Sequence, residues 1–63
     1  MKIDLYDKVI LKTGEVAYIV EILGDGKCFV ADIDYADGTS TDFIYPKDIL
    51  QVIKMESEIS KTA

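Results

Sequence analysis

Every second residue from Phe29 to Tyr35 is apolar, with Asp32 and Asp34 at the intervening positions of the second half, and this period of two constrains the fold more than any other feature of the chain. A strand that is buried on one side alternates in this way, because successive side chains point to opposite faces of a sheet. An amphipathic helix would instead repeat its apolar residues every three or four positions. One side of the predicted strand holds Phe29, Ala31, Ile33 and Tyr35, and the other holds Cys28, Val30, Asp32 and Asp34.

Short apolar runs between turn residues predict four further strands. Residues 16–23 carry a single charge, so we expect that strand to be long and largely buried. Together with residues 28–35, the predicted strands cover residues 9–11, 16–23, 39–45 and 51–54.

Glycine and proline mark the ends of these strands. Glycine-containing turns are predicted at residues 13–14, 24–26 and 36–38, because glycine adopts positive φ without a steric penalty. Pro46 ends the fourth strand, because it has no N–H to donate to the ladder. Residues 46–49 are predicted to form one 3₁₀ or helical turn.

The length and the turns together predict the architecture. A chain of 63 residues forms one domain, and five short strands must curl to bury one core and protect their edges. We therefore expect an all-β fold, namely a five-stranded SH3-like barrel with a one-turn 3₁₀ helix before the last strand. An OB-fold is the alternative, although it needs more residues and normally a longer helix. We expect the barrel to cover residues 1–54, and residues 55–63 to form a flexible or weakly helical tail.

The order of the segments carries a family resemblance. Residues 5–11, Gly14 and residues 16–22 resemble the first two strands of KOW-like and other small bacterial SH3-like domains, and residues 29–52 resemble the remaining strands. The chain is similar in particular to an uncharacterised bacterial family whose members end in a Leu-Pro-x-x-x-Leu type of turn. The corresponding turn here reads Tyr45-Pro46-Lys47-Asp48-Ile49-Leu50.

This resemblance implies a fold, and only weakly a role. Eukaryotic SH3 domains bind polyproline in an aromatic groove that includes a tryptophan, and this chain has no tryptophan. KOW-like domains contact RNA or ribosomal protein through basic loops and a glycine in the second strand. Ala17 lies near the place of that glycine, and the turns here carry Asp25 and Asp37.

The cysteine and histidine counts exclude several kinds of site. One cysteine cannot form an internal disulfide, and a chain without histidine cannot build a His-containing zinc site. Cys28 has no histidine to act as its base, so we interpret it as a structural thiol. A domain this small offers no deep pocket in which paired carboxylates would acquire the pKa values of an acid–base pair. We therefore predict a protein that is not an enzyme and uses no cofactor.

The charge balance bears on partners and location. The chain carries 12 carboxylates, seven lysines and no arginine, and its formal net charge is −5. Direct nucleic acid binding is disfavoured, because such binding depends on neutralising phosphates with lysine and arginine. No apolar stretch approaches a signal peptide or a membrane span, so we expect no membrane association and a soluble cytoplasmic protein. A small core supplies little stability, and association with further copies of the chain would add to it, so a homo-oligomer remains an alternative to a monomer.

Acidic residues supply the first candidate surface. Asp32, Asp34 and Asp42 are expected to cluster, with Asp37 in the turn between their strands. Like charges placed opposite each other destabilise a sheet, so a basic partner or a loosely held cation would relieve the cluster. The alternative is that exposed carboxylates only protect a sheet edge from aggregation. No calcium loop is predicted, because an EF-hand counted from Asp32 lacks its glycine at position 6 and its glutamate at position 12.

Two tyrosines supply the second candidate surface. Tyr6 precedes the first strand and Tyr45 precedes the proline turn, and such positions meet across the barrel mouth in SH3-like folds. They would form a shallow amphipathic patch of the kind that is enriched in interaction hot spots. The alternative is that they only cover the end of the barrel. The candidate partner-binding residues are therefore Tyr6, Asp32, Asp34, Asp37, Asp42 and Tyr45.

These observations favour a small interaction module that binds a protein partner through an acidic face or an aromatic rim. One alternative is an acidic inhibitor that mimics nucleic acid, as some small phage-encoded proteins do. That alternative requires carboxylates spaced along one surface like phosphates. A second alternative is a KOW-like accessory of the ribosome or of a polymerase that contacts protein rather than RNA.

Overall fold

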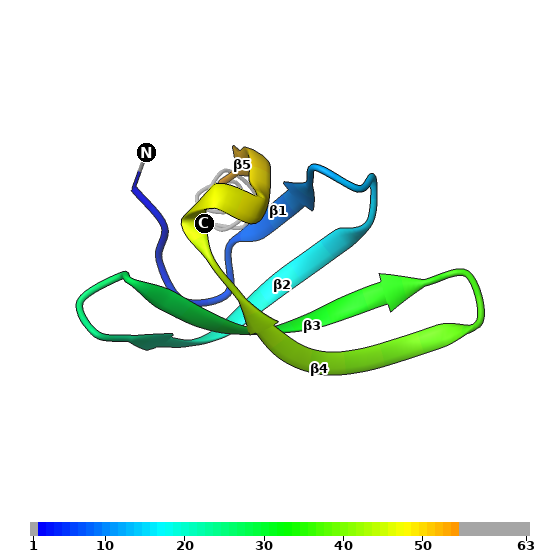
Figure 1. Cartoon of the computed structure of the whole chain (residues 1–63), viewed down its shortest axis with the longest axis horizontal. Helices are drawn as coiled ribbons and strands as arrows, with labels where there is room; N and C mark the ends of the chain where they lie inside the picture. Colours follow the sequence, from blue (N-terminus) through cyan, green and yellow to red (C-terminus); the bar gives the residue numbers. More distant parts are fainter. Residues whose placement is uncertain (1, 55–63) are drawn as a thin grey trace, which may run out of the picture.

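The computed structural model describes residues 2–54, which form one antiparallel sheet and a single 3₁₀ turn (Figure 1). The elements are β1 (Lys8–Leu11), β2 (Val16–Leu23), β3 (Cys28–Tyr35), β4 (Gly38–Ile44), η1 (Pro46–Asp48) and β5 (Ile49–Ile53). The strand order across the sheet is β4-β3-β2-β1-β5, and every neighbouring pair is antiparallel. The predicted all-β class is therefore confirmed. No helix within residues 2–54 has the length and apolar character needed to cross a bilayer.

The strand boundaries differ from the predicted ones by one or two residues. β1 begins at Lys8, one residue early, because Lys8 already pairs with β2 and β5. β4 begins at Gly38 and ends at Ile44, so Tyr45 lies just outside the strand. β5 begins at Ile49, because Ile49 pairs with β1 instead of extending the 3₁₀ turn.

The sheet is open, so closure into a barrel is not confirmed. β4 and β5 are its two edges, and no strand pairing joins them within residues 2–54. η1 carries the chain from one edge to the other, and β5 then pairs with β1 (Figure 1). The predicted tail, residues 55–63, lies outside the described residues.

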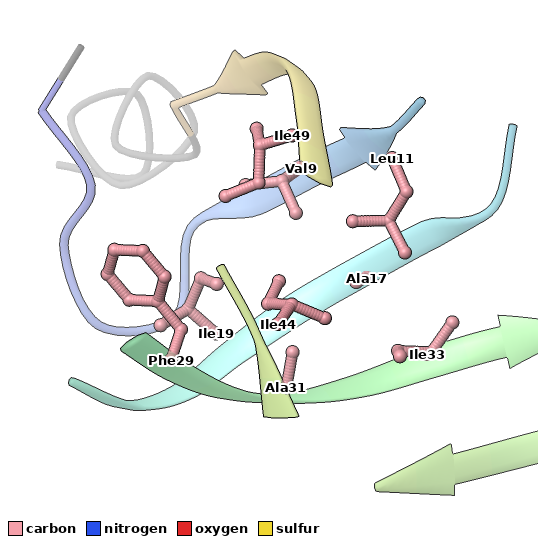
Figure 2. Close-up of a cluster of buried hydrophobic side chains, with 9 residues drawn as sticks. All are labelled: Val9, Leu11, Ala17, Ile19, Phe29, Ala31, Ile33, Ile44 and Ile49. Atoms are coloured by element: carbon pink, nitrogen blue, oxygen red, sulfur yellow. The ribbon is translucent and has the colours of Figure 1, made fainter. Parts of the chain in front are cut away.

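Nine apolar side chains form the core on one face of the sheet (Figure 2). The two edge strands both reach it, because Ile44 of β4 and Ile49 of β5 belong to the same cluster. The sheet therefore curls around its core although its edges do not pair. The nine residues are Val9, Leu11, Ala17, Ile19, Phe29, Ala31, Ile33, Ile44 and Ile49.

β2 is less buried than predicted. Ala17 and Ile19 are buried, whereas Tyr18 and Glu21 are exposed. The physical reason is that a single curled sheet covers only one of its faces. The opposite face, which we call the outer face, is not covered by any other element within residues 2–54.

A turn of only two residues joins β3 to β4. Tyr35 pairs with Gly38, which leaves residues 36–37 as the loop. Gly38 has a φ of 140°, a value that residues with an L side chain rarely adopt. Gly38 thus belongs to β4 and not to the turn, and this sets the register of the whole hairpin.

Lys54 links the end of β5 to the N-terminal segment. Its Nζ lies 2.6 Å from Oδ2 of Asp7 and 3.0 Å from Oδ2 of Asp4. Asp7 is buried, and its Oδ2 also accepts a hydrogen bond of 2.8 Å from the backbone N–H of Asp4. The hydrogen bond from Lys54 holds the pKa of Asp4 below its ordinary value. The hydrogen bond to Asp7 raises the pKa of Lys54.

Candidate protein-interaction surface

Negative charge is concentrated on the hairpin of β3 and β4, residues 28–44, which we call the acidic arm. The arm carries four aspartates and no lysine, whereas the rest of residues 2–54 carries six carboxylates and six lysines. The ion pairs of the described residues join Lys2 and Lys54 to Asp4 and Asp7, and all of them lie outside the arm. The excess charge of residues 2–54 therefore lies on one hairpin.

Two of the predicted aspartates, Asp32 and Asp34, lie together on the outer face. Thr41 is opposite Asp32, and its hydroxyl donates a hydrogen bond of 2.6 Å to Oδ1 of that carboxylate. Thr39 is opposite Asp34 and donates a hydrogen bond of 2.9 Å in the same way. Each carboxylate is thus held in place across the strands by a neutral donor, and the predicted opposition of like charges does not occur.

The predicted cluster of three aspartates is wrong, because Asp42 lies on the other face of the hairpin. Asp42 is opposite Ala31, a core residue, so its side chain leaves the sheet on the core side. Its Oδ1 accepts a hydrogen bond of 2.8 Å from the backbone N–H of Phe43. Asp37 lies in the turn and is exposed. The arm therefore presents carboxylates on both faces and at its tip.

Exposed aromatic side chains accompany the outer carboxylates. Phe43 is 60% exposed and lies opposite Val30 on the outer face, next to Thr41 in its strand's outward row. Tyr18 is also exposed and lies opposite Asp32 from the other side. Neither residue is among the candidates predicted from the sequence. The alternation of β4, with Phe43 two residues after Thr41, is the signal that could have found Phe43.

Tyr6 and Tyr45 are both exposed, at 70% and 47%. Tyr6 has a φ of 69° and donates its backbone N–H to the carbonyl of Ile19. Tyr45 precedes η1, and its backbone N–H donates to Oδ2 of Asp48 at 3.0 Å. No hydrogen bond within residues 2–54 joins the two tyrosines, and their meeting in one patch stays a prediction.

A hollow of about 350 Å³ lies on the core side of the arm. Its apolar lining includes Ile33 and Ile44, at the edge of the core. Asp42, Glu15 and Asp48 bring three carboxylates to it, and Lys12 brings one ammonium group. The hollow therefore combines apolar lining with an excess of negative charge.

Within residues 2–54 there is no set of three cysteine, aspartate or glutamate side chains placed to hold a metal ion. Cys28 is half-buried at the start of β3, and its thiol faces the carbonyl of Phe29 at 3.9 Å. What the arm offers is charge, aromatic surface and a strand edge.

No family model matches the chain, and no curated protein and no solved structure shows significant similarity to it.

Proposed function

We propose that this protein is a non-enzymatic interaction module that binds a basic protein through its acidic arm. The binding needs no cofactor, because charge and exposed aromatic area supply its energy. We place it in the cytoplasm, where the lone Cys28 thiol stays reduced.

The observation that carries the proposal is the separation of charge. A hairpin with four aspartates and no lysine projects a negative potential that attracts a positively charged partner and orients it during approach. Tyr18, opposite Asp32, and Phe43, opposite Val30, are exposed on the same face and add apolar contact area of the kind found at interaction hot spots. The threonine hydroxyls fix two of the carboxylates, which lowers the entropy cost of ordering them on binding.

The arrangement of the carboxylates favours a protein partner over mimicry of nucleic acid. A phosphate-like row would place the charges along one surface. Asp32 and Asp34 lie on the outer face, whereas Asp42 lies on the core side. A polypeptide that lies along the arm reaches both sets, because its own side chains alternate between two faces.

We infer further that the open sheet is an SH3-like barrel in its topology. Two features support this: β1 lies between β2 and β5, and a 3₁₀ turn precedes the last strand. Such small barrels are scaffolds on which partner surfaces vary.

Affinity capture from native lysate, at low and at high salt, tests the function. We expect a basic protein to be retained at low salt and released at high salt, since salt screens exposed charges. The variants Asp32→Asn and Asp34→Asn, singly and combined, keep the acceptor for the threonine hydroxyl and should weaken retention of that protein. Asp25→Asn removes one charge from the β2–β3 turn and serves as the matched control.

Equal retention by the arm variants and by Asp25→Asn would contradict the proposal. Retention of a nucleic-acid-binding enzyme that DNA displaces would favour mimicry instead. Co-purification of ribosomal or polymerase subunits would identify the accessory role.

A further inference from the structure

β4 is an edge strand with one hydrogen-bonded neighbour. The strand order ends at β4, so only its β3 side is paired within residues 2–54. Six of its seven residues, Gly38 to Phe43, are exposed, and only Ile44 is buried. An edge of this kind presents unpaired N–H and C=O groups to solvent, where another strand can pair with them.

The register identifies which backbone groups are free. Tyr35 and Gly38 close a two-residue loop, so they form a hydrogen-bonded pair. Such pairs alternate along an antiparallel ladder, and β3 and β4 stay in register to Phe29 and Ile44. Ser40, Asp42 and Ile44 therefore point their backbone groups toward β3, and Thr39, Thr41 and Phe43 point theirs away from it.

Side-chain contacts agree with this assignment. The backbone N–H of Phe43 points outward and is taken by the carboxylate of its neighbour Asp42. Outside the strand ladders, no hydrogen bond within residues 2–54 involves the backbone N–H or the carbonyl oxygen of Thr39 or Thr41. The backbone groups of Thr39 and Thr41 on the outer edge of β4 are thus free to pair with another strand. The third outward N–H, that of Phe43, already donates to the carboxylate of Asp42.

We propose that this open edge of β4 binds an extended, lysine- or arginine-bearing segment of another protein by strand addition. The inference rests on the proposed function and deepens it: the acidic arm selects the partner, and the main chain of β4 holds it. An added strand alternates its side chains between the outer face, beside Phe43 of β4 and one strand away from Asp32 and Asp34 of β3, and the core side, beside Asp42.

Charge selects a basic segment over a second copy of this chain. Two β4 edges paired with each other would bring eight aspartates together without a lysine on either hairpin. Like charges brought together in this way destabilise the pairing, whereas lysine or arginine side chains near Asp42 and within reach of the other three aspartates stabilise it.

The other edge strand is a poorer acceptor. β5 has five residues, and its pairing with β1 shifts register between Ile10 and Leu11. An irregularity of this kind twists a strand and interrupts a ladder. β4 has seven residues, and its ladder with β3 has no such shift.

The hollow on the core side gives the inward side chains a place. Asp42 and Ile44, the two core-side residues at the end of β4, line it, together with Glu15 before β2 and Asp48 of η1. A lysine or arginine side chain that points inward can lay its apolar stem against Ile44 and bring its charge to these carboxylates.

Synthetic peptides test the inference directly. The probe is an acetylated, amidated peptide of alternating lysine and valine, eight residues long, which spans the length of β4. The first control replaces lysine by glutamate. The second control keeps all side chains but carries N-methyl groups on the two central residues, which removes one donor from each edge of the peptide. Binding is measured by isothermal titration calorimetry, and amide hydrogen exchange is followed by NMR on the full chain.

We expect the amides of Ser40 and Asp42 to exchange slowly in the free protein and those of Thr39 and Thr41 to exchange fast. The lysine peptide should protect Thr39 and Thr41, the glutamate peptide should not bind, and N-methylation should weaken binding about tenfold or more. Equal binding of the methylated peptide without protection would overturn strand addition and leave charge-driven binding to the arm intact. No binding of the lysine peptide would also overturn it, and protection of Thr39 and Thr41 by self-association would assign the edge to a second copy.

Two variants of Thr41 give an independent test. Thr41→Val removes the hydroxyl but keeps the outward N–H, whereas Thr41→Pro removes both without deleting a β3–β4 hydrogen bond. We expect Thr41→Pro to abolish binding of the lysine peptide and Thr41→Val to retain it. Equal binding by the two variants would overturn the proposal. If Thr41→Pro does not fold, the protection of the Thr39 and Thr41 amides in the unaltered chain tests strand addition instead.

Discussion

Lys54 and Asp7 form an ion pair of 2.6 Å across a sequence separation of 47 residues, and the carboxylate of this pair is buried. The pair joins the residue after β5 to the residue before β1. β1 and β5 bring the two together, because Lys8 is opposite Ile53 in their ladder. The contact therefore fastens the last described residue to the start of the sheet.

Removing the ammonium group of Lys54 should destabilise the fold more than the loss of an ordinary surface lysine does. In Lys54→Met the buried carboxylate of Asp7 loses its counter-charge and keeps only the backbone N–H of Asp4. We expect a lower Tm in thermal unfolding followed by circular dichroism. Lys47→Met, which removes an exposed lysine of η1 without an ion pair among the described residues, is the matched control and should change Tm little. Equal Tm values for the two variants would show that the pair contributes nothing.

The hydrogen bonds of Lys54 to Asp4 and Asp7 predict how the stability of the fold depends on pH. The pKa of Asp4 is lowered in the folded state by the hydrogen bond from Lys54, so its contribution is present above the ordinary aspartate pKa and is lost as pH falls through the folded value. The pKa of Lys54 is raised by Asp7, so its contribution is present below the ordinary lysine pKa and is lost as pH rises through the folded value. We expect the Tm difference between wild type and Lys54→Met to be largest between about pH 5 and 9 and to shrink in acid below about pH 4 and in alkali above about pH 10.5. A difference that stays constant from acid to alkali would refute the assignment.

Gly38 is predicted to be essential to the β3–β4 hairpin because of its backbone angle alone. Its φ is 140°, and a Cβ built on it meets no atom within 4 Å, so any loss in a variant comes from backbone strain. We expect Gly38→Ala to cost about 1–3 kcal/mol in urea unfolding. A chain of 63 residues is accessible to chemical synthesis, and D-alanine at position 38 is the control, since it favours positive φ. Equal losses for the L and D residues would contradict this explanation.

The hairpin register also marks the limit of what sequence reasoning achieved. The period of two correctly predicted five strands and the burial of Phe29, Ala31 and Ile33 in β3, whereas Tyr35, predicted on the same face, is 40% exposed at the end of the strand. It could not decide whether the turn held two residues or three. With Gly38 in the turn, Asp32 would face Asp42; with Gly38 in β4, Asp42 faces Ala31 instead. A shift of one residue moves a side chain to the other face of a sheet, and this is why the predicted cluster failed.

Contacts between residues that are far apart in the chain could not be predicted from the sequence for a related reason. Nothing local in the sequence indicates that Asp7 is buried or that Lys54 reaches it, because both depend on the pairing of β1 with β5. Closure of the sheet into a barrel is likewise not indicated by any local pattern, because it depends on how far the two edge strands curl around Ile44 and Ile49. The burial of Ile19 and Phe29, by contrast, follows from short-range alternation and was within reach.

The small core predicts a narrow margin of stability. Ile19 is fully buried at the centre of the sheet, and Leu50 of β5 is 63% exposed. We expect Ile19→Val to cost about 1 kcal/mol and Ile19→Ala about 2–5 kcal/mol, which is comparable to the whole stability of about 3–5 kcal/mol that a core of this size supplies. Ile19→Ala should therefore be largely unfolded by circular dichroism, whereas Leu50→Ala should stay within about 0.5 kcal/mol of wild type. A folded, cooperative Ile19→Ala would contradict the assignment of the core.

A variant of Phe43 tests the role of the outer face in binding separately from any role in folding. Its side chain is 60% exposed, so its removal leaves no cavity, and Phe43→Ala should keep the wild-type Tm within experimental error. Because an exposed aromatic beside an open strand edge is placed to cover an added strand, the same variant should weaken binding of the lysine–valine peptide about tenfold. Phe29→Ala is the opposite control, since Phe29 lies buried across the same hairpin and its loss should lower stability first. Calorimetric titration and thermal unfolding on the two variants give both quantities. If Phe43→Ala instead lowers Tm while binding per folded molecule is unchanged, Phe43 serves the sheet and the outer face is not the contact surface.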